Sequence, residues 1–246
     1  MMIIGIISDI HGNLPALETA LEEVRARGAE KVIGLGDWVG YGPFPGAVID
    51  RLRREEADRD MVCIRGNYDE KVLEARRDPA AFDGRLKPGK WAVLNWTRKH
   101  ISDDQAAWLD SLPDSLDMTP VPGCRMQVYH GSPEGNEGRM YPSITREALK
   151  SMTAEPFPEI LVVGHTHVPF VKTIDGCMIV NGGSAGQPVD GDPRPMFAQI
   201  TVTENAPPAA AIIRFQYPMD ELLRGLHASG LPRWLIRDFQ TGTKRK

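Results

Sequence analysis

The sequence has few cysteines and no long apolar run. Its three cysteines, Cys63, Cys124 and Cys177, are widely separated in a chain of 246 residues. An odd and sparse set excludes a disulfide framework and indicates a reducing compartment. No apolar run approaches the roughly 18 residues that a membrane span needs, and the apolar start reaches Asp9 too soon for a signal peptide. We therefore expect a soluble, cytoplasmic protein without membrane contact.

The sequence also lacks an excess of positive charge. Lysine and arginine together number 29, aspartate and glutamate 33, and the formal net charge is −4. A chain of this charge is a poor candidate for holding a polynucleotide on a basic face, so no nucleic-acid partner is expected. The basic end, residues 244–246, is short and is interpreted as a frayed, solvated tail.

Apolar runs and helical patterns alternate over the first quarter of the chain. The apolar runs at residues 2–7, 31–35 and 61–64 predict buried strands. Between them, apolar residues at helical spacing predict two helices, the first beginning after the capping residue Asn13. This β-α-β-α-β opening implies a parallel sheet with helices packed on it.

The second half of the chain changes character. After a helical stretch at residues 70–110, short strands are predicted at residues 125–129, 160–163, 170–174, 178–180, 196–203 and 210–215. Asp175-Gly176 predicts a hairpin turn. We expect one α/β domain over residues 1–246 that ends, from about residue 217, in a helix and a tail. The helical stripe of Leu222, Leu223 and Leu226 indicates core or dimer packing, so a homo-oligomer stays open.

Residues that can bind a metal follow the predicted strands. Three strands in the first quarter are followed by donors, and two later strands are followed by histidines: Asp9, His11, Asp37, Asn67, His130, His165 and His167. The carboxyl ends of strands in an open α/β sheet meet at one rim, where ligands bind. Seven donors at one rim suit two metal ions, and the mixture of carboxylate and imidazole favours Mn, Fe, Zn or Ni.

Each of these donors taken alone has a plainer interpretation. A Gly-Asp or Gly-Asn pair after a strand is usually a turn, and a lone histidine is usually a hydrogen-bonded core or surface residue. The joint occurrence favours a metal centre, because four of the six histidines follow predicted strands. Glycines also flank the donors and allow close approach of the backbone: Gly36, Gly66, Gly131 and Gly164.

Five ordered motifs together resemble those of the calcineurin-like metallophosphoesterases: Asp9-Ile10-His11, Gly36-Asp37, Gly66-Asn67, His130-Gly131 and Gly164-His165-Thr166-His167. The resemblance implies a four-layer α-β-β-α sandwich of two mixed β-sheets with a site for two divalent metal ions at one edge. It implies that Asp9, His11 and His167 hold one ion. It further implies that Asn67, His130 and His165 hold the other and that Asp37 bridges them.

The resemblance implies a metal-dependent phosphohydrolase, a phosphodiesterase or phosphatase that uses a metal-bound hydroxide. Two neighbouring metal ions can clamp the attacking and leaving oxygens of a phosphoryl transfer and lower the pKa of bound water. The neutral ligand Asn67 leaves positive charge for an anionic substrate. A small phosphate ester is therefore the expected substrate, with monoester and diester both open.

Tyr68 departs from the family pattern, which has a histidine beside the asparagine as general acid. A phenol has an ordinary pKa of about 10, against about 6.5 for imidazole, and suits this role less well at neutral pH. Tyr68 is either a catalytic hydrogen-bond donor or part of the wall of the site. Asp69, which orients the histidine in the usual pattern, is either catalytic or the cap of the next helix. The departure supports an alternative, a noncatalytic metal-binding scaffold or protein-interaction module of the same fold.

Three further residues are candidates for contact with substrate. Tyr41 follows Asp37 in a Gly/Pro-rich loop and either borders the substrate or packs within the loop. Arg65 either binds phosphate or pairs with a nearby acid, and Arg139 is a weaker phosphate candidate. The shape of the pocket is expected to depend on loops at residues 38–46, 132–143 and 184–195.

Overall fold

The computed structural model describes residues 1–58, 60–204 and 206–244. Its first sheet has the strand order β10-β9-β1-β2-β3. The strands are β1 (Met2–Ile7), β2 (Lys31–Gly34), β3 (Met61–Cys63), β9 (Met196–Thr203) and β10 (Ala206–Arg214). β1, β2 and β3 are parallel, whereas β9 runs antiparallel to both β1 and β10. The parallel opening predicted from the sequence is thus confirmed.

The second sheet has the strand order β4-β5-β6-β8-β7. Its strands are β4 (Ser115–Val121), β5 (Cys124–Tyr129), β6 (Ile160–Val163), β7 (Phe170–Ile174) and β8 (Cys177–Asn181). β5, β6 and β8 are parallel, and the flanking strands are antiparallel to their neighbours. The hairpin between β7 and β8 turns at Asp175-Gly176, where both residues have positive φ.

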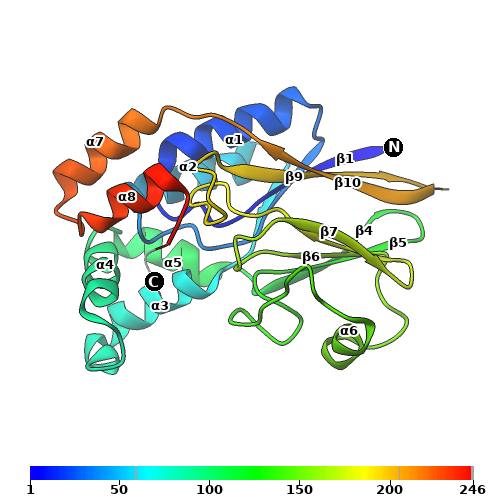
Figure 1. Ribbon diagram of the computed structural model, residues 1–246, viewed down its shortest axis with the longest axis horizontal. Coiled ribbons are helices and arrows are strands. Elements are labelled where there is room, and N and C mark those ends of the chain that lie inside the picture. The colour runs from blue at the N-terminus through cyan, green and yellow to red at the C-terminus, as the bar shows by residue number, and fades with distance from the viewer. Residues whose placement is uncertain (59, 205, 245–246) are drawn as a thin grey trace.

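Helices cover the outer faces of the two sheets (Figure 1). Most of the helices lie on the side of the first sheet or beside its carboxyl ends: α1 (Leu14–Ala26), α2 (Pro45–Asp58), α3 (Asn67–Arg77), the 3₁₀ helix η1 (Pro79–Phe82), α4 (Pro88–Lys99), α5 (Asp103–Ser111), α7 (Met219–Ser229) and α8 (Trp234–Thr241). The short helix α6 (Arg146–Met152) covers the second sheet. The layers are therefore α, β, β and α, which confirms the predicted fold class.

Alternation of side chains along the strands produces separate cores between these layers. Ile4 and Ile6 of β1 point toward the second sheet and pack with Val128 and Val162. Ile7 belongs to the other core, between the first sheet and its helices. The α6 layer packs through Leu149 in a third cluster. Because three cores hold the strands from both sides, the strand ends are fixed in position relative to one another.

Three elements were not predicted from the sequence. β4 is an edge strand in which exposed and half-buried residues alternate, and it contains Pro120, so it lacks the apolar run of a buried strand. α6 has seven residues, too few for a clear helical pattern. The end of the chain after residue 217 holds α7 and α8 instead of one helix. Leu222 and Leu226 of α7 are buried within the chain.

The described part of the chain has no helix that is both long and apolar enough to cross a membrane. Cys63, Cys124 and Cys177 are free and buried.

Candidate metal centre

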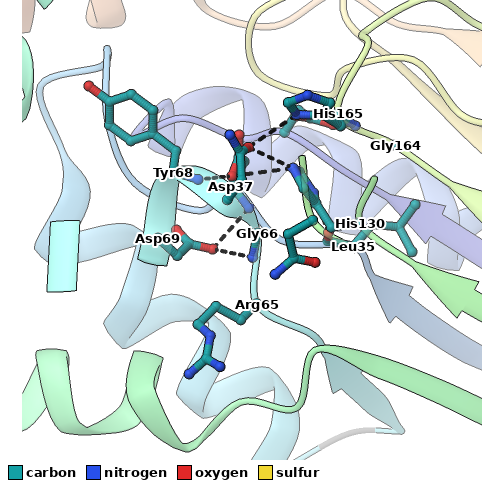
Figure 2. A network of polar contacts seen from close by, with 12 residues as sticks. Leu35, Asp37, Arg65, Gly66, Tyr68, Asp69, His130, Gly164 and His165 are labelled. Carbon is teal, nitrogen blue, oxygen red and sulfur yellow. Dashed lines mark hydrogen bonds and ion pairs between the residues drawn. The ribbon is translucent and has the colours of Figure 1, made fainter. Parts of the chain in front are cut away.

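The seven predicted ligands lie together at the carboxyl ends of the strands, between the two sheets. Asp9 and His11 follow β1, Asp37 follows β2, and Asn67 is the first residue of α3. The second sheet contributes the other three from the ends of β5 and β6: His130, His165 and His167. Figure 2 shows Asp37 from the first sheet facing His130 and His165 from the second.

The first cluster consists of Asp9, His11 and His167, all buried. Asp9 Oδ1 lies 3.0 Å from His167 Nε2 and 3.7 Å from His11 Nε2. The two imidazole nitrogens are 3.2 Å apart. Three potential ligand atoms thus face one small volume.

The second cluster contains His130 and His165 with Asp37, and Asn67 completes it. Asn67 Oδ1 lies 3.1 Å from His130 Nε2 and 3.1 Å from His165 Nδ1. His165 is half-buried and borders the cavity described below.

Asp37 lies between the two clusters and faces both. Its Oδ1 is 3.4 Å from His130 Nε2, and its Oδ2 is 3.6 Å from His11 Nε2. The backbone N–H of Tyr68 donates a hydrogen bond of 2.7 Å to Oδ1 and fixes the carboxylate plane. One oxygen faces each cluster, so Asp37 is placed to be shared between them.

Backbone carbonyls orient three of the four imidazoles. Nδ1–H of His130 donates to Leu35 O at 2.7 Å, and Nδ1–H of His167 donates to Gln187 O at 2.5 Å. Nδ1 of His11 lies 3.3 Å from Val39 O. A ring that donates from Nδ1 in its neutral form presents an unprotonated Nε2, which is the arrangement of metal-ligating histidines.

The donor set fits divalent cations. His11 Nε2 and His167 Nε2 lie 3.2 Å apart in a buried position, and Asp9 Oδ1 accepts no hydrogen bond from any described residue. Burial, and next the neighbouring His167, lower the pKa of His11 well below its ordinary value, which keeps the ring neutral. Against burial, the carboxylates of Asp37 and Asp9 raise the pKa of His130, so this pocket attracts positive charge. A cation at each cluster would satisfy these groups.

The backbone is strained where the ligands are presented. Seven non-glycine residues in the described ranges have positive φ, and Tyr41 is one of them. Five others are candidate ligands: Asp9, His11, Asp37, His165 and His167. Such conformations cost on the order of 1–3 kcal/mol each and are found preferentially at functional sites. The strain therefore marks the same residues as the sequence motifs do.

Two glycines allow the turns after β2 and β3 to interlock. A Cβ on Gly36 would lie 2.3 Å from Gly66 N, and a Cβ on Gly66 would lie 2.3 Å from Asp37 Oδ1. Neither position has room for a side chain, which confirms the close approach predicted from the sequence. Asp37 and Asn67 are brought to one place by this contact.

Glu137 is a site residue that the sequence did not reveal. Its carboxylate accepts a hydrogen bond of 3.0 Å from Asn67 Nδ2 and pairs with Lys71. Because the amide nitrogen of Asn67 is held by Glu137, its oxygen is directed at His130 and His165. Glu137 lies 70 residues away in the chain, in the loop after β5, and no local pattern marks it.

Asp69 lies beneath the site and acts on the backbone. It is fully buried, and its two oxygens accept from the N–H groups of Asp37, Trp38, Val39 and Gly66 at 2.9–3.2 Å. Burial and the nearby Asp37 raise the pKa of Asp69 to about 7, an effect that the N–H groups oppose. Asp69 does not line the cavity. Its placement supports the helix-cap interpretation over the catalytic one.

A cavity of about 350 Å³ opens above the clusters. It reaches ligands of both clusters and is walled by aromatic, apolar and charged side chains: Tyr41, Tyr68, Lys71, Leu86, Lys90, Leu94, Glu137, Arg139, Tyr141, Thr166 and Lys244. The loops at residues 38–46 and 132–143 shape it as expected. The loop at residues 184–195 does not line it and instead holds His167 from behind through Gln187 O.

Tyr68 and Tyr41 form the aromatic wall next to the first cluster. Their ring centroids are 4.8 Å apart, and the Tyr41 ring meets His11 edge-on at 4.9 Å. A Cβ on Gly40 would lie 2.2 Å from the Tyr68 ring, so the tyrosine fills the available space on that side. Burial, then Tyr41 and Asp37, raise the pKa of Tyr68 well above its ordinary value. Tyr68 is therefore a neutral phenol at physiological pH.

Arg65 points away from the centre, as Figure 2 shows. Its guanidinium pairs with Asp114 at 2.6 Å and with Asp110 at 3.5 Å, and it does not line the cavity. Two acids hold Arg65 on another surface, which supports the ion-pair alternative. Arg139, the weaker of the two phosphate candidates in the sequence, does line the cavity.

The basic end of the chain also differs from expectation. Lys244 lines the cavity, whereas Arg245 and Lys246 lie outside the described residues. Lys244 could be placed only by the fold, because α8 ends beside the site.

Comparison with known proteins agrees with these features. The model of the calcineurin-like phosphoesterase superfamily domain matches residues 2–205. The chain is 29% identical to an uncharacterized protein of Methanocaldococcus jannaschii, with 94% of this chain and 95% of that protein covered. It is 26% identical to phosphodiesterase YfcE of Escherichia coli, over 78% of this chain and 84% of YfcE.

Two solved structures share the fold over almost the full length. A metallophosphoesterase from Sphaerobacter thermophilus has a TM-score of 0.76 and 27% identity, with 98% of this chain and 99% of that chain covered. A hypothetical protein from Pyrococcus horikoshii OT3 has a TM-score of 0.86 and 24% identity, with both chains covered completely. The second likeness concerns the fold alone.

Proposed function

The chain belongs to the calcineurin-like phosphoesterase superfamily, and on this basis we propose that it is a metal-dependent phosphohydrolase. The reaction is hydrolysis of phosphate esters, most readily diesters with good leaving groups, and two divalent cations are the cofactors. The observation that carries the proposal is the complete set of seven donors, converging from both sheets on two adjoining clusters. The phosphodiesterase activity named for the relative YfcE points the same way.

The ligands divide between two positions. Asp9, His11 and His167 would hold one cation, and Asn67, His130 and His165 the other, with Asp37 shared between them. When bound, the cations would act as Lewis acids on the phosphoryl oxygens and supply an activated water.

The protein's own groups set the charge and orientation of the substrate. Asp9 and Asp37 are the two carboxylates of the donor set, and the other five donors are neutral when they act as ligands. The loaded site therefore keeps a net positive charge that attracts a phosphate anion. The cavity directs the ester across both clusters, and the wall of Tyr41 and Tyr68 packs against its organic part.

Tyr68 limits the range of leaving groups. Its phenol is neutral and lies in a buried position that raises its pKa, so it is a weak proton donor. It can still donate a hydrogen bond to an ester oxygen. Esters with acidic leaving groups, which depart without a proton, are the favoured substrates.

Assay of the reconstituted protein tests this function. The purified chain would be stripped of metal, reloaded with Mn²⁺, Fe²⁺, Ni²⁺ or Zn²⁺, and assayed on nitrophenyl phosphate mono- and diesters. We expect metal-dependent turnover that is lost in Asp37→Ala and retained in Glu22→Gln, a change at an exposed acid on α1. Turnover that is independent of metal, or unaffected by Asp37→Ala, would refute the proposal.

The substitution of tyrosine for the usual histidine favours one second candidate, a noncatalytic metal-binding or interaction module. This alternative predicts that the chain binds two cations but hydrolyses none of the esters. Cation binding measured by calorimetry in parallel with turnover separates the two functions.

A further inference from the structure

The cavity lining carries more positive charge than a single phosphate needs. Four cationic side chains line it, from four separate parts of the chain: Lys71 on α3, Lys90 on α4, Arg139 in the loop after β5, and Lys244 after α8. This concentration occurs in a chain whose net charge is −4. Positive charge gathered in one cavity of an acidic protein attracts anions to that cavity.

Three of the four cations have no carboxylate partner. Lys71 is paired with Glu137, which also holds Asn67. Lys90, Arg139 and Lys244 form no ion pair with any residue in the described ranges. Burial lowers the pKa of Lys244, the carboxylates of Asp9 and Asp37 oppose this effect, and the positive charges of Lys90 and Arg139 add to it. Lys244 therefore lies within electrostatic reach of the other two cations.

The fold holds Lys244 at this place. Gly242 ends α8 with a positive φ of 63°, and a Cβ there would lie 2.4 Å from Asp192 O. Gly191 N–H donates to Gly242 O at 2.8 Å and ties the tail to a neighbouring loop. From this anchor the Lys244 ammonium lies 5.9 Å from the centre of the Tyr41 ring, a cation–π distance.

The cavity lining also includes apolar and aromatic side chains. Leu86 and Leu94 on the α4 side, with Tyr41 and Tyr141, belong to it. A ligand that fills the cavity therefore meets three kinds of side chain: metal ligands, apolar and aromatic groups, and cations.

We propose that Lys90, Arg139 and Lys244 bind a second anionic group of the substrate, so that the protein selects organic phosphate esters that carry a further phosphate. The inference rests on the proposed phosphohydrolase function. The reacting phosphate lies over the metal ligands, the organic body packs against Tyr41, Leu86 and Leu94, and the second phosphate lies among the three cations.

A matched pair of esters tests this selection. Thymidine 5′-(4-nitrophenyl phosphate) and its 3′-phosphorylated form lose the same nitrophenolate from the same bond and differ only in the second phosphate. We expect kcat/KM to be about tenfold or more higher for the 3′-phosphorylated ester at low ionic strength, because three exposed cations contribute up to about fivefold each. Raising the salt concentration should reduce this ratio.

Variants identify the residues responsible. Lys90→Met, Arg139→Met and Lys244→Met should each lower kcat/KM for the 3′-phosphorylated ester and leave the simple ester within about twofold. Lys99→Met, at the exposed end of the same helix as Lys90 but outside this cavity, is the matched control and should change neither value. Equal rates for the two esters, or variants that slow both esters equally, would overturn the inference while the phosphohydrolase function stands.

A binding measurement keeps the inference separate from catalysis. Inorganic diphosphate would be titrated into the metal-free protein by calorimetry, where the three cations act without the metals. We expect binding by the native chain and about a tenfold loss in the triple variant Lys90→Met, Arg139→Met, Lys244→Met, with an unchanged circular dichroism spectrum. If neither ester is hydrolysed, the proposed function fails, and this titration alone tests whether the three cations bind phosphate. Equal binding of diphosphate by the native chain and the triple variant would overturn the inference.

Discussion

The two ligand clusters differ in burial and in the contacts that hold their side chains in place. In the first cluster, Asp9, His11 and His167 are buried, and backbone carbonyls hold both rings. In the second, His165 is half-buried, and Asn67 is oriented by Glu137, an exposed side chain on a loop. The first cluster is therefore part of the packed core, whereas the second depends on contacts that the loop after β5 provides. We expect the second position to bind its cation more weakly and to be the one that substitutions alter selectively.

Substitution of Asp69 is expected to have the largest effect, because it should disrupt both clusters. Asp69→Ala leaves four buried N–H groups unpaired, including those of Asp37 and Gly66, at the point where the turns after β2 and β3 meet. We expect a loss of about 3 to 5 kcal/mol in the free energy of unfolding, measured by urea denaturation, and loss of both cations. Asp104→Ala, at an exposed acid on α5, is the control. A loss below about 1 kcal/mol would contradict the clamping role of Asp69.

Substitution of Glu137 is expected to weaken cation binding at the second cluster alone. Glu137→Ala frees the amide of Asn67 to rotate, so the second cation should bind about 10- to 100-fold more weakly while the first is unchanged. Glu137→Gln keeps an acceptor for Asn67 Nδ2 and should recover part of the affinity. Glu134→Ala, in the same loop, is the control. Two-site metal titration by calorimetry is the measurement, and equal weakening at both sites would show that Glu137 does not orient Asn67.

Substitution of Tyr68 tests whether its phenol, which lines the cavity above the clusters, takes part in catalysis. Tyr68→Phe should change kcat for nitrophenyl diesters by less than about threefold, since these leaving groups need no proton. Tyr68→His supplies a group with an ordinary pKa near 6.5 and should raise kcat for alkyl esters by about tenfold. Steady-state kinetics on both ester types measure these effects. A loss above about 100-fold in Tyr68→Phe would assign the phenol a direct catalytic role.

The smallest effect concerns the helical layer outside both clusters. Although burial opposes ionisation of Glu55, hydrogen bonds from Arg25 and Arg51 lower its pKa below the ordinary value of 4.5. A depressed carboxyl pKa stabilises the fold above the unfolded-state value and loses this contribution as the pH falls through the folded-state value. Glu55→Gln should therefore cost about 1 kcal/mol at pH 7 and almost nothing at pH 3, with cation affinity unchanged. Denaturation at both pH values checks this, and an equal loss at the two would contradict it.

The site residues that could be predicted from the sequence are those that directly follow buried strands. Asp9, Asp37 and His130 follow apolar runs that are visible in the sequence, and parallel strands bring such positions to one edge. Glu137 and Lys244 follow no such signal, because each reaches the site through a loop or a chain end whose path only the packed structure defines. The two alternatives for Arg65 could not be separated from the sequence for the same reason, since its partners Asp110 and Asp114 lie more than 40 residues away in sequence.

The fold shows a similar division. Buried strands were predicted nearly to the residue, as with β1 and β6, because both faces of such strands are apolar. The edge strand β4 and the short helix α6 are stabilised by their neighbours more than by their own patterns, and sequence periodicity therefore misses them.

We infer that two cations bind at two clusters joined by Asp37. Anomalous diffraction from crystals of the Mn²⁺- or Zn²⁺-loaded protein tests it most directly. Two peaks are expected, one beside Asp9 Oδ1, His11 Nε2 and His167 Nε2, and one beside Asn67 Oδ1, His130 Nε2 and His165 Nδ1. A single peak, or peaks away from these atoms, would contradict the account.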